Sequence, residues 1–187
     1  MQGSRSLTNE ELNQMLLIAT PRDRLFILTG ITFGTRISEA LELRFRDVEG
    51  KTLRLKSKKN SSNQEFPIPE GYKIAVKAAK KAYVDIHINV DQNSRMFLSM
   101  VHARERGHVM SPQNANAIIR GLAKKVGFEG KISCHSFRKS FVTRIYEKTS
   151  FNIAATQKYS RHRSLSNLQY YISTSDEMDL INDELWG

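Results

Sequence analysis

The 187-residue sequence contains a single cysteine, Cys134, and lacks any long apolar run. One cysteine cannot form an internal disulfide or supply a cysteine-based zinc site, so we expect Cys134 to be a small packed residue. No stretch of about 18 apolar residues is present, and the first 20 residues lack a basic region followed by an apolar one. These absences predict a soluble intracellular protein without a membrane partner.

The sequence also lacks a glycine-rich loop suited to cradling a phosphate and a pair of carboxylates suited to two-metal catalysis. His87, His102 and His108 have neither the spacing of metal ligands nor paired carboxylates nearby, which favours loop or surface positions. Neither pattern therefore points to a metal or cofactor site.

Basic residues are in excess: 29 Lys and Arg against 19 Asp and Glu give a net charge of +10. Residues 173–187 hold five acids and no basic residue, so residues 1–172, with 29 basic and 14 acidic residues, carry a net charge of +15. Such a surplus favours a polyanion as partner. Charge alone is equally typical of a solvated basic face.

The length predicts one domain, and a hydrophobic content of 40% can fill its core. A capping box from Thr8 to Glu11 begins the first expected helix, and we expect Thr35 to cap the third. Alternating residues around a polar turn predict a basic β-hairpin over 53–69. The expected fold class is mostly α with a small antiparallel β-sheet (α+β). Helical spacing is found over residues 9–19, 22–33, 35–43, 70–85, 111–127, 134–148 and 151–159.

Several basic residues could contact a phosphate. His135 and Arg138 lie at i and i+3 of an expected helix, so both could reach one phosphate. Arg36 at a helix start could add a second guanidinium. Taken singly, each is more typical of a solvated face or a surface charge.

Three further residues complete the candidate set. Lys59 lies in the hairpin turn, where a flexible ammonium could reach a DNA oxygen, although an ordinary polar turn residue is the simpler reading. His162 lies between Arg161 and Arg163, a cluster that could bind phosphates without catalysis. Tyr170 and Tyr171 point about 100° apart on a helix, so at most one faces a given site.

The order of these residues resembles the catalytic domain of the tyrosine recombinase (phage integrase) family over roughly residues 7–173. The stretch from Leu28 to Arg44, with Thr35-Arg36-Ile-Ser-Glu-Ala-Leu at its centre, is similar to the first arginine box of that family. His135-Ser-Phe-Arg138 is similar to the second box. His162 precedes Tyr171 by nine residues, the spacing of the last histidine and the nucleophile in that family.

The resemblance implies a site-specific recombinase or integrase that cleaves and rejoins DNA through a covalent 3'-phosphotyrosyl intermediate, without metal or ATP. The two arginines would hold the nonbridging oxygens, and the histidines would add hydrogen bonds, with His135 also a proton acceptor. Tyr171 would attack phosphorus and Lys59 would protonate the leaving 5'-oxygen. The implied catalytic residues are Arg36, Lys59, His135, Arg138, His162 and Tyr171.

The sequence departs from the family pattern at one motif and leaves alternative residues and alternative functions open. The family commonly has Leu-Gly-His where this chain has Ser160-Arg161-His162, which predicts a differently shaped turn. Lys58 is the alternative to Lys59, and Tyr170 is the alternative to Tyr171. Other functions with the same basic fold are a type IB topoisomerase and a non-catalytic DNA-binding protein. A metal-dependent nuclease is a third alternative.

The expected organisation is a remnant of expression or a linker over 1–6, a catalytic domain over 7–175 and an acidic tail over 176–187. The apolar residues of the tail suggest docking on a partner subunit. Members of the family usually carry an N-terminal clamp domain, so the chain is either a fragment or a minimal enzyme, and residues 1–4, which resemble a remnant of expression, favour a fragment. The expected partners are double-stranded DNA and further copies of the chain, as a tetramer on DNA and a monomer in isolation. The expected location is the host cytoplasm, with the nucleoid when DNA is bound.

Overall fold

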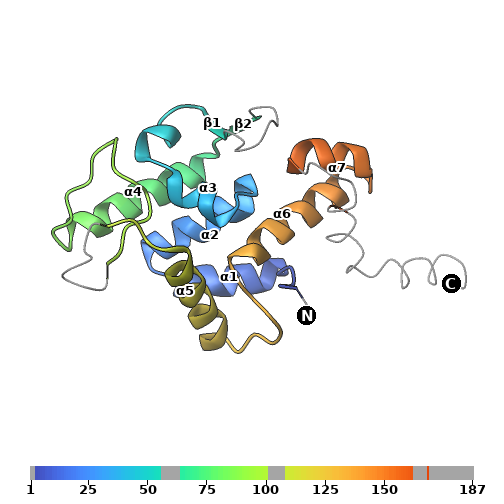
Figure 1. Ribbon diagram of the computed structural model, residues 1–187, viewed down its shortest axis with the longest axis horizontal. Coiled ribbons are helices and arrows are strands. Elements are labelled where there is room, and N and C mark those ends of the chain that lie inside the picture. The colour runs from blue at the N-terminus through green and yellow to red at the C-terminus, as the bar shows by residue number, and fades with distance from the viewer. Residues whose placement is uncertain (1–2, 56–63, 101–107, 162–167, 169–187) are drawn as a thin grey trace, which may run out of the picture. The chain divides into compact units, whose positions relative to one another are not determined.

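The computed structural model describes residues 3–55, 64–100 and 108–161, together with Leu168 (Figure 1). The chain forms two compact units, Met1–Ser140 and Phe141–Gly187. Its described part is mostly helical with one two-stranded antiparallel sheet, which confirms the expected fold class. The elements are α1 (Asn9–Ile18), α2 (Pro21–Phe33), α3 (Ile37–Glu42), the 3-10 turn η1 (Phe45–Val48), β1 (Thr52–Leu55), β2 (Gln64–Pro67), α4 (Glu70–Val84), α5 (Pro112–Lys125), α6 (Cys134–Lys148) and α7 (Ile153–Ser160).

The first two helices begin as the sequence predicts. The Thr8 side chain accepts a hydrogen bond from the Glu11 amide, and the Glu11 carboxylate accepts one from the Thr8 amide. This capping box satisfies two backbone donors at the start of α1. Thr20 caps α2, which then ends at Gly34 in the left-handed conformation with φ 58°. Glycine takes that conformation at little cost, so α2 stops where the sequence predicts.

The core of the first unit lies between α2 and α4, which run beside each other in Figure 1. The rings of Phe33 and Tyr72 meet edge to face with centroids 4.9 Å apart. The Tyr72 hydroxyl lies 2.8 Å from the Thr29 hydroxyl, so the polar end of this buried tyrosine is satisfied. Burial raises the pKa of Tyr72 well above its usual range. The two helices are therefore joined by apolar packing and by one buried hydrogen bond.

The predicted hairpin is present. Strands β1 and β2 pair antiparallel with Leu53 opposite Phe66, and both of these side chains are buried. Arg54 and Glu65 form an ion pair on the exposed face. The alternation of buried and exposed residues in β1 is the period-2 pattern of a strand with one face on the core.

The start of α3 differs from the expectation. Arg36, and not Thr35, occupies the N-cap position, and the Arg36 amide donates to the Glu39 carboxylate at 2.8 Å. The Thr35 side chain caps nothing, because the residue before it is the left-handed Gly34 that ends α2. A single residue therefore separates the end of one helix from the N-cap of the next.

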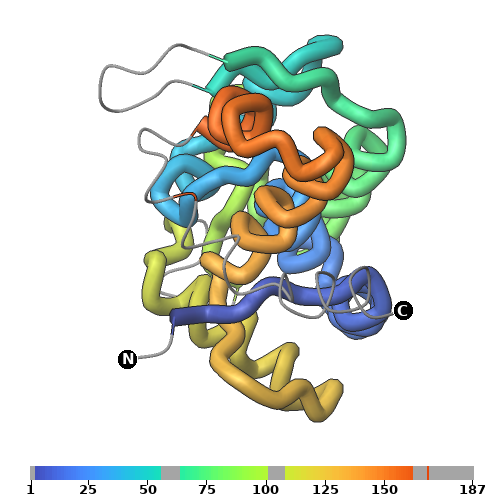
Figure 2. The backbone as a smooth tube through the Cα atoms, turned by 90° about the vertical axis from the view of Figure 1, so that its right-hand side faces the viewer, coloured from blue at the N-terminus to red at the C-terminus, as the bar shows by residue number. Residues whose placement is uncertain are grey.

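Helix α6 approaches α2 closely. A Cβ added at Gly30 would lie 2.7 Å from the Cβ of Phe137, closer than van der Waals contact allows. Gly30 is therefore required by the close approach of the Phe137 side chain to the backbone of α2. The N-terminal segment runs beside the residues that precede α6, as Figure 2 shows, and the Arg5 amide donates to the Lys131 carbonyl. Arg5 and Ser4, which we expected to lie in a remnant or linker, thus make specific contacts in this unit.

In the second unit, α7 begins at Ile153, two residues later than expected. Ser150 and Phe151 have φ values of 51° and 60°, which are incompatible with helix, and Asn152 caps α7 instead. The helix ends at Arg161, which takes the left-handed conformation with φ 57° and ψ 35°. In the described part of the chain, no helix is long and apolar enough to cross a bilayer.

Candidate active site

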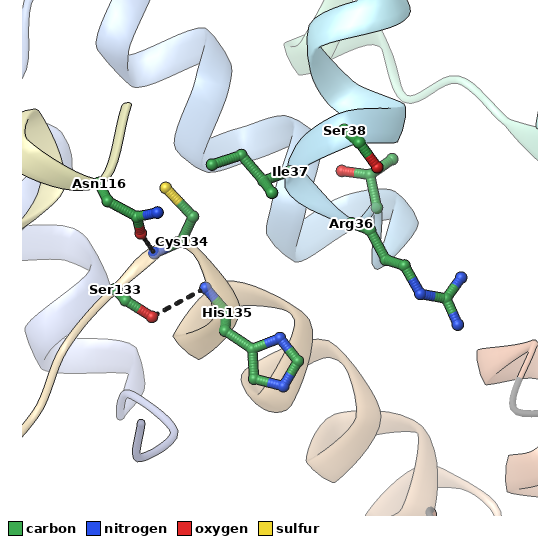
Figure 3. Close-up of a pocket in the computed structure, with 8 residues that line it drawn as sticks. Arg36, Ile37, Ser38, Asn116, Ser133, Cys134 and His135 are labelled. Carbon is green, nitrogen blue, oxygen red and sulfur yellow. Dashed lines mark hydrogen bonds between the residues drawn. The ribbon is translucent and has the colours of Figure 1, made fainter. Parts of the chain in front are cut away.

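A pocket of about 310 Å³ in the first unit is lined by residues from three separate parts of the chain. Figure 3 shows Arg36 at the start of α3 and His135 in the first turn of α6 on its walls. These are two of the residues that the sequence assigns to a phosphate. The full lining is Thr35, Arg36, Ile37, Ser38, Asn116, Ser133, Cys134 and His135.

The Arg36 guanidinium is held at the rim of this pocket by Glu39. The Arg36 Nη1 and the Glu39 Oε1 are 3.0 Å apart, and the second carboxylate oxygen accepts the Arg36 amide. The Arg36 side chain is 49% exposed, whereas that of Glu39 is 8% exposed. Glu39 therefore anchors both the backbone and the side chain of Arg36 and leaves part of the guanidinium open to a ligand.

The first turn of α6 is fixed by polar side chains around it. The Asn116 Oδ1 accepts from the Cys134 amide at 3.1 Å, and the Ser133 Oγ accepts from the His135 amide at 3.1 Å (Figure 3). Asn116 also donates through Nδ2 to the Pro112 carbonyl within α5, so its bond to the Cys134 amide ties α5 to α6. Two backbone donors that a helix start leaves open are thereby satisfied. Burial raises the pKa of Cys134 to about 12, so Cys134 is a packed thiol as expected.

Arg138 lies one turn further along α6 and is only 1% exposed. Its Nη1 donates to the carbonyl of Gly34, the residue that ends α2. The guanidinium therefore links α6 to the segment that carries Thr35 and Arg36. The structure does not place Arg138 on a solvated helix face, which was the simpler reading of the sequence.

His135 is surrounded by positive charge. Loss of hydration around its ring lowers the pKa of His135, and the cations of Arg138, Lys139 and Arg36 lower it further. The pKa of Lys139, which is 5% exposed, is also lowered by burial. At neutral pH the imidazole is therefore uncharged, and a neutral imidazole can accept a proton. The local field attracts an anion to this pocket.

The remaining candidates lie outside the described residues. These are Lys59 with its alternative Lys58, His162, and Tyr171 with its alternative Tyr170. Of the other histidines, His87 and His108 are exposed, as the sequence predicts, and His102 also falls outside the described part. Within that part, no cluster of three or more His, Cys, Asp or Glu residues could hold a metal ion.

A model of the phage integrase family matches residues 5–178, which is most of the chain. The chain belongs to the phage integrase family. Tyrosine recombinase XerA of Thermococcus onnurineus is 27% identical over 92% of this chain and 59% of its own length. The probable integrase/recombinase YoeC of Bacillus subtilis is 30% identical over 95% of this chain and 92% of its own length. The phage integrase-family chain thus spans little more than half of the archaeal XerA relatives and nearly all of YoeC.

Solved structures share the fold of this phage integrase-family chain. The crystal structure of XerA recombinase gives a TM-score of 0.73 at 20% identity, covering all of this chain and 67% of that one. A post-cleavage complex of the XerH site-specific recombinase with its difH substrate gives a TM-score of 0.74 at 20% identity, covering 99% of this chain and 54% of that one. At such low identity the likeness establishes the fold.

Three residues of the pocket region were not assigned a role from the sequence. Glu39 stands at i+3 from Arg36, a spacing that signals an ion pair, and could have been found. The role of Asn116 could not have been predicted, because its contact with Cys134 is made between two different helices, α5 and α6. Thr35 was expected only as a helix cap.

Proposed function

We propose that this chain is the catalytic part of a site-specific recombinase that cleaves and rejoins DNA strands through a covalent 3'-phosphotyrosyl intermediate. The observation that carries the proposal is the pocket that brings Arg36 and His135 together from distant segments. Family membership supports it, as does the net charge of +15 over residues 1–172. A phosphodiester is an anion that gains charge during attack, and the Arg36 cation lines this pocket, with the charges of Arg138 and Lys139 acting on the His135 ring.

Each residue has one role in the proposed cycle. The Tyr171 hydroxyl loses its proton to His135 and its oxygen attacks phosphorus. The bond from phosphorus to the 5'-oxygen breaks, and Lys59 gives that oxygen its proton. Arg36, Arg138 and His162 stabilise the nonbridging oxygens as charge develops. Because the tyrosyl ester keeps the energy of the broken bond, a 5'-hydroxyl of another strand can reverse the step without ATP or a metal ion.

The test is the covalent adduct itself. The protein is incubated with nicked duplexes of random sequence in the presence of a chelator, and denaturing gels are examined for a protein band that carries DNA. We expect the adduct to form in chelator, and sequencing of the trapped DNA identifies the preferred site. Strand breaks that disappear in chelator would instead indicate a metal-dependent nuclease. Relaxation of a supercoiled plasmid without a defined site would indicate the topoisomerase alternative.

We also propose that residues 7–175 form the catalytic domain and that the acidic tail, residues 176–187, docks on a neighbouring copy in a tetramer on DNA. The opposite charge of tail and body supports this exchange. Deletion of 176–187 is expected to shift the assembly state on DNA, measured by light scattering. Unchanged assembly and unchanged cleavage would refute the role of the tail.

A further inference from the structure

Thr35 has a buried hydroxyl with no hydrogen-bond partner in the described part of the chain. The residue is 4% exposed and lines the same pocket as Arg36 and His135. It lies between Gly34, whose carbonyl accepts from Arg138, and Arg36. Thr35 is therefore adjacent in sequence both to Gly34, which binds Arg138, and to Arg36 itself.

A buried hydroxyl without a hydrogen-bond partner lowers the stability of the folded protein, and most buried polar groups in proteins have a partner. Thr29 serves as a comparison, because it is a buried threonine in the core of the first unit, outside the pocket. It is fully buried, its Oγ1 donates to the Leu25 carbonyl at 2.7 Å, and the Tyr72 hydroxyl lies 2.8 Å away. Thr35 differs from Thr29 in this respect, and of the buried hydroxyls without a partner in the described residues, those of Thr35 and Ser99, only that of Thr35 belongs to a residue lining this pocket.

Two other polar side chains that line the pocket are bonded to the protein. Asn116 is bonded to the Cys134 amide and the Pro112 carbonyl, and Ser133 is bonded to the His135 amide and the Ser4 hydroxyl. These side chains hold the walls in place. Thr35 contributes nothing to that framework, so its hydroxyl is available to a ligand.

We propose that the Thr35 hydroxyl is a further catalytic group, which donates a hydrogen bond to a nonbridging oxygen of the DNA phosphodiester bound beside Arg36. The inference rests on the proposed function. A threonine hydroxyl takes one of three staggered positions about the Cα–Cβ bond, so a change of rotamer on DNA binding would turn it to the phosphate. A hydrogen bond to an anionic oxygen is stronger than one between neutral groups and strengthens further as charge develops.

Three variants separate this role from a structural one. Thr35→Val removes the hydroxyl at nearly constant shape, Thr35→Ser keeps it, and Thr29→Val is the matched control in the core. We expect Thr35→Val to melt at or above the wild-type temperature, because it removes an unsatisfied polar group. At saturating nicked duplex it should form the covalent adduct more slowly by about tenfold or more, the effect of one hydrogen bond to a charged acceptor. Thr35→Ser should restore most of the rate.

Thr29→Val is expected to melt at a lower temperature while its folded fraction forms the adduct at the wild-type rate. A Thr35→Val rate equal to wild type, or a Thr35→Ser rate as low as that of Thr35→Val, contradicts the proposal. If the wild-type protein forms no adduct at all, the proposed function fails, and Thr35 is then judged by affinity for the nicked duplex. Weaker binding by Thr35→Val than by Thr35→Ser supports the contact with phosphate, and equal binding overturns it.

Discussion

Arg36 and Arg138 share a charge but differ in their surroundings. Arg36 is half exposed and paired with Glu39, whereas Arg138 is buried and bound to the backbone of Gly34. Loss of an exposed ion pair has little effect on stability, but loss of a buried charged partner leaves other groups unsatisfied. The two arginines therefore affect folding differently even where their proposed roles in catalysis match.

We predict that Arg36→Ala and Arg138→Ala each slow adduct formation by an amount corresponding to about 2.7–4 kcal/mol, the usual loss for one transition-state donor. Arg36→Ala should unfold within about 1 kcal/mol of wild type in urea, while Arg138→Ala should be clearly less stable. Rates are measured on the folded fraction at saturating DNA. Wild-type rates in both variants would remove the two arginines from the proposed site.

His135 should titrate below the usual range of histidine. Its pKa is lowered by burial of the ring first and then by Arg138, Lys139 and Arg36. Arg36→Gln is expected to raise the pKa only in part, because the largest cause remains. Nuclear magnetic resonance of the imidazole protons in the free protein measures both values, and a pKa above about 6.5 in the wild type would contradict this description.

The lowered pKa of His135 also makes the stability of the protein depend on pH. Because the pKa of His135 is lower in the folded protein, the unfolded chain binds a proton at this position more readily. The free energy of unfolding therefore decreases as the pH falls from about 6.5, the unfolded value, to the lower folded pKa. His135→Asn should reduce that loss.

At the residue scale, the ordered motifs led to the expectation that Arg36 and His135 act at one site, and the structure places both on the walls of one pocket. The motifs were not enough to predict the unsatisfied hydroxyl of Thr35. That feature depends on Arg36, one residue later, occupying the N-cap of α3 after the left-handed Gly34. Local propensity favours threonine over arginine as a cap, and tertiary packing overrides it here.

At the scale of elements, the approach of α2 to α6 depends on one glycine. We predict that Gly30→Ala lowers the free energy of unfolding by about 1–3 kcal/mol, since its new methyl group would overlap the Phe137 side chain. Gly121→Ala in α5 is the matched control, because nothing lies within 4 Å of its added Cβ. The control should be more stable than wild type by about 0.5–1 kcal/mol, as alanine is the better helix former. Equal effects at both positions would argue against the close contact.

The end of α7 stores strain at Arg161. Its left-handed conformation is one that glycine, the residue of the Leu-Gly-His pattern, adopts at less cost than arginine. We predict that Arg161→Gly raises the free energy of unfolding by about 1 kcal/mol. Arg161→Ala keeps the strained conformation and should show no such gain. A gain for alanine equal to that for glycine would mean that side-chain loss, and not backbone relief, stabilises the variant.

The helices were more predictable than their ends. Capping boxes, an initial proline and a final glycine mark most boundaries within a residue or two, and the α2 end at Gly34 is an example. The start of α7 was wrong by two residues because Ser150 and Phe151 adopt left-handed conformations that no residue type signals.

At the scale of the whole molecule, family membership and fold follow from motifs spread over nearly the full sequence. Net charge favours a polyanion partner, and only the ordered motifs favour the proposed strand transfer over simple binding. The proposed chemistry requires a phenol as well as cations. The identity of the tyrosine that supplies this phenol is therefore the decisive test of the proposed chemistry.

The most direct measurement is identification of the tyrosine that carries DNA. The adduct is trapped on a nicked duplex, digested with protease and nuclease, and analysed by mass spectrometry, alongside the variants Tyr171→Phe and Tyr170→Phe. The account predicts a nucleotide on Tyr171, no adduct with Tyr171→Phe and a normal adduct with Tyr170→Phe. A nucleotide on any other residue, or an adduct that survives in Tyr171→Phe, would contradict it.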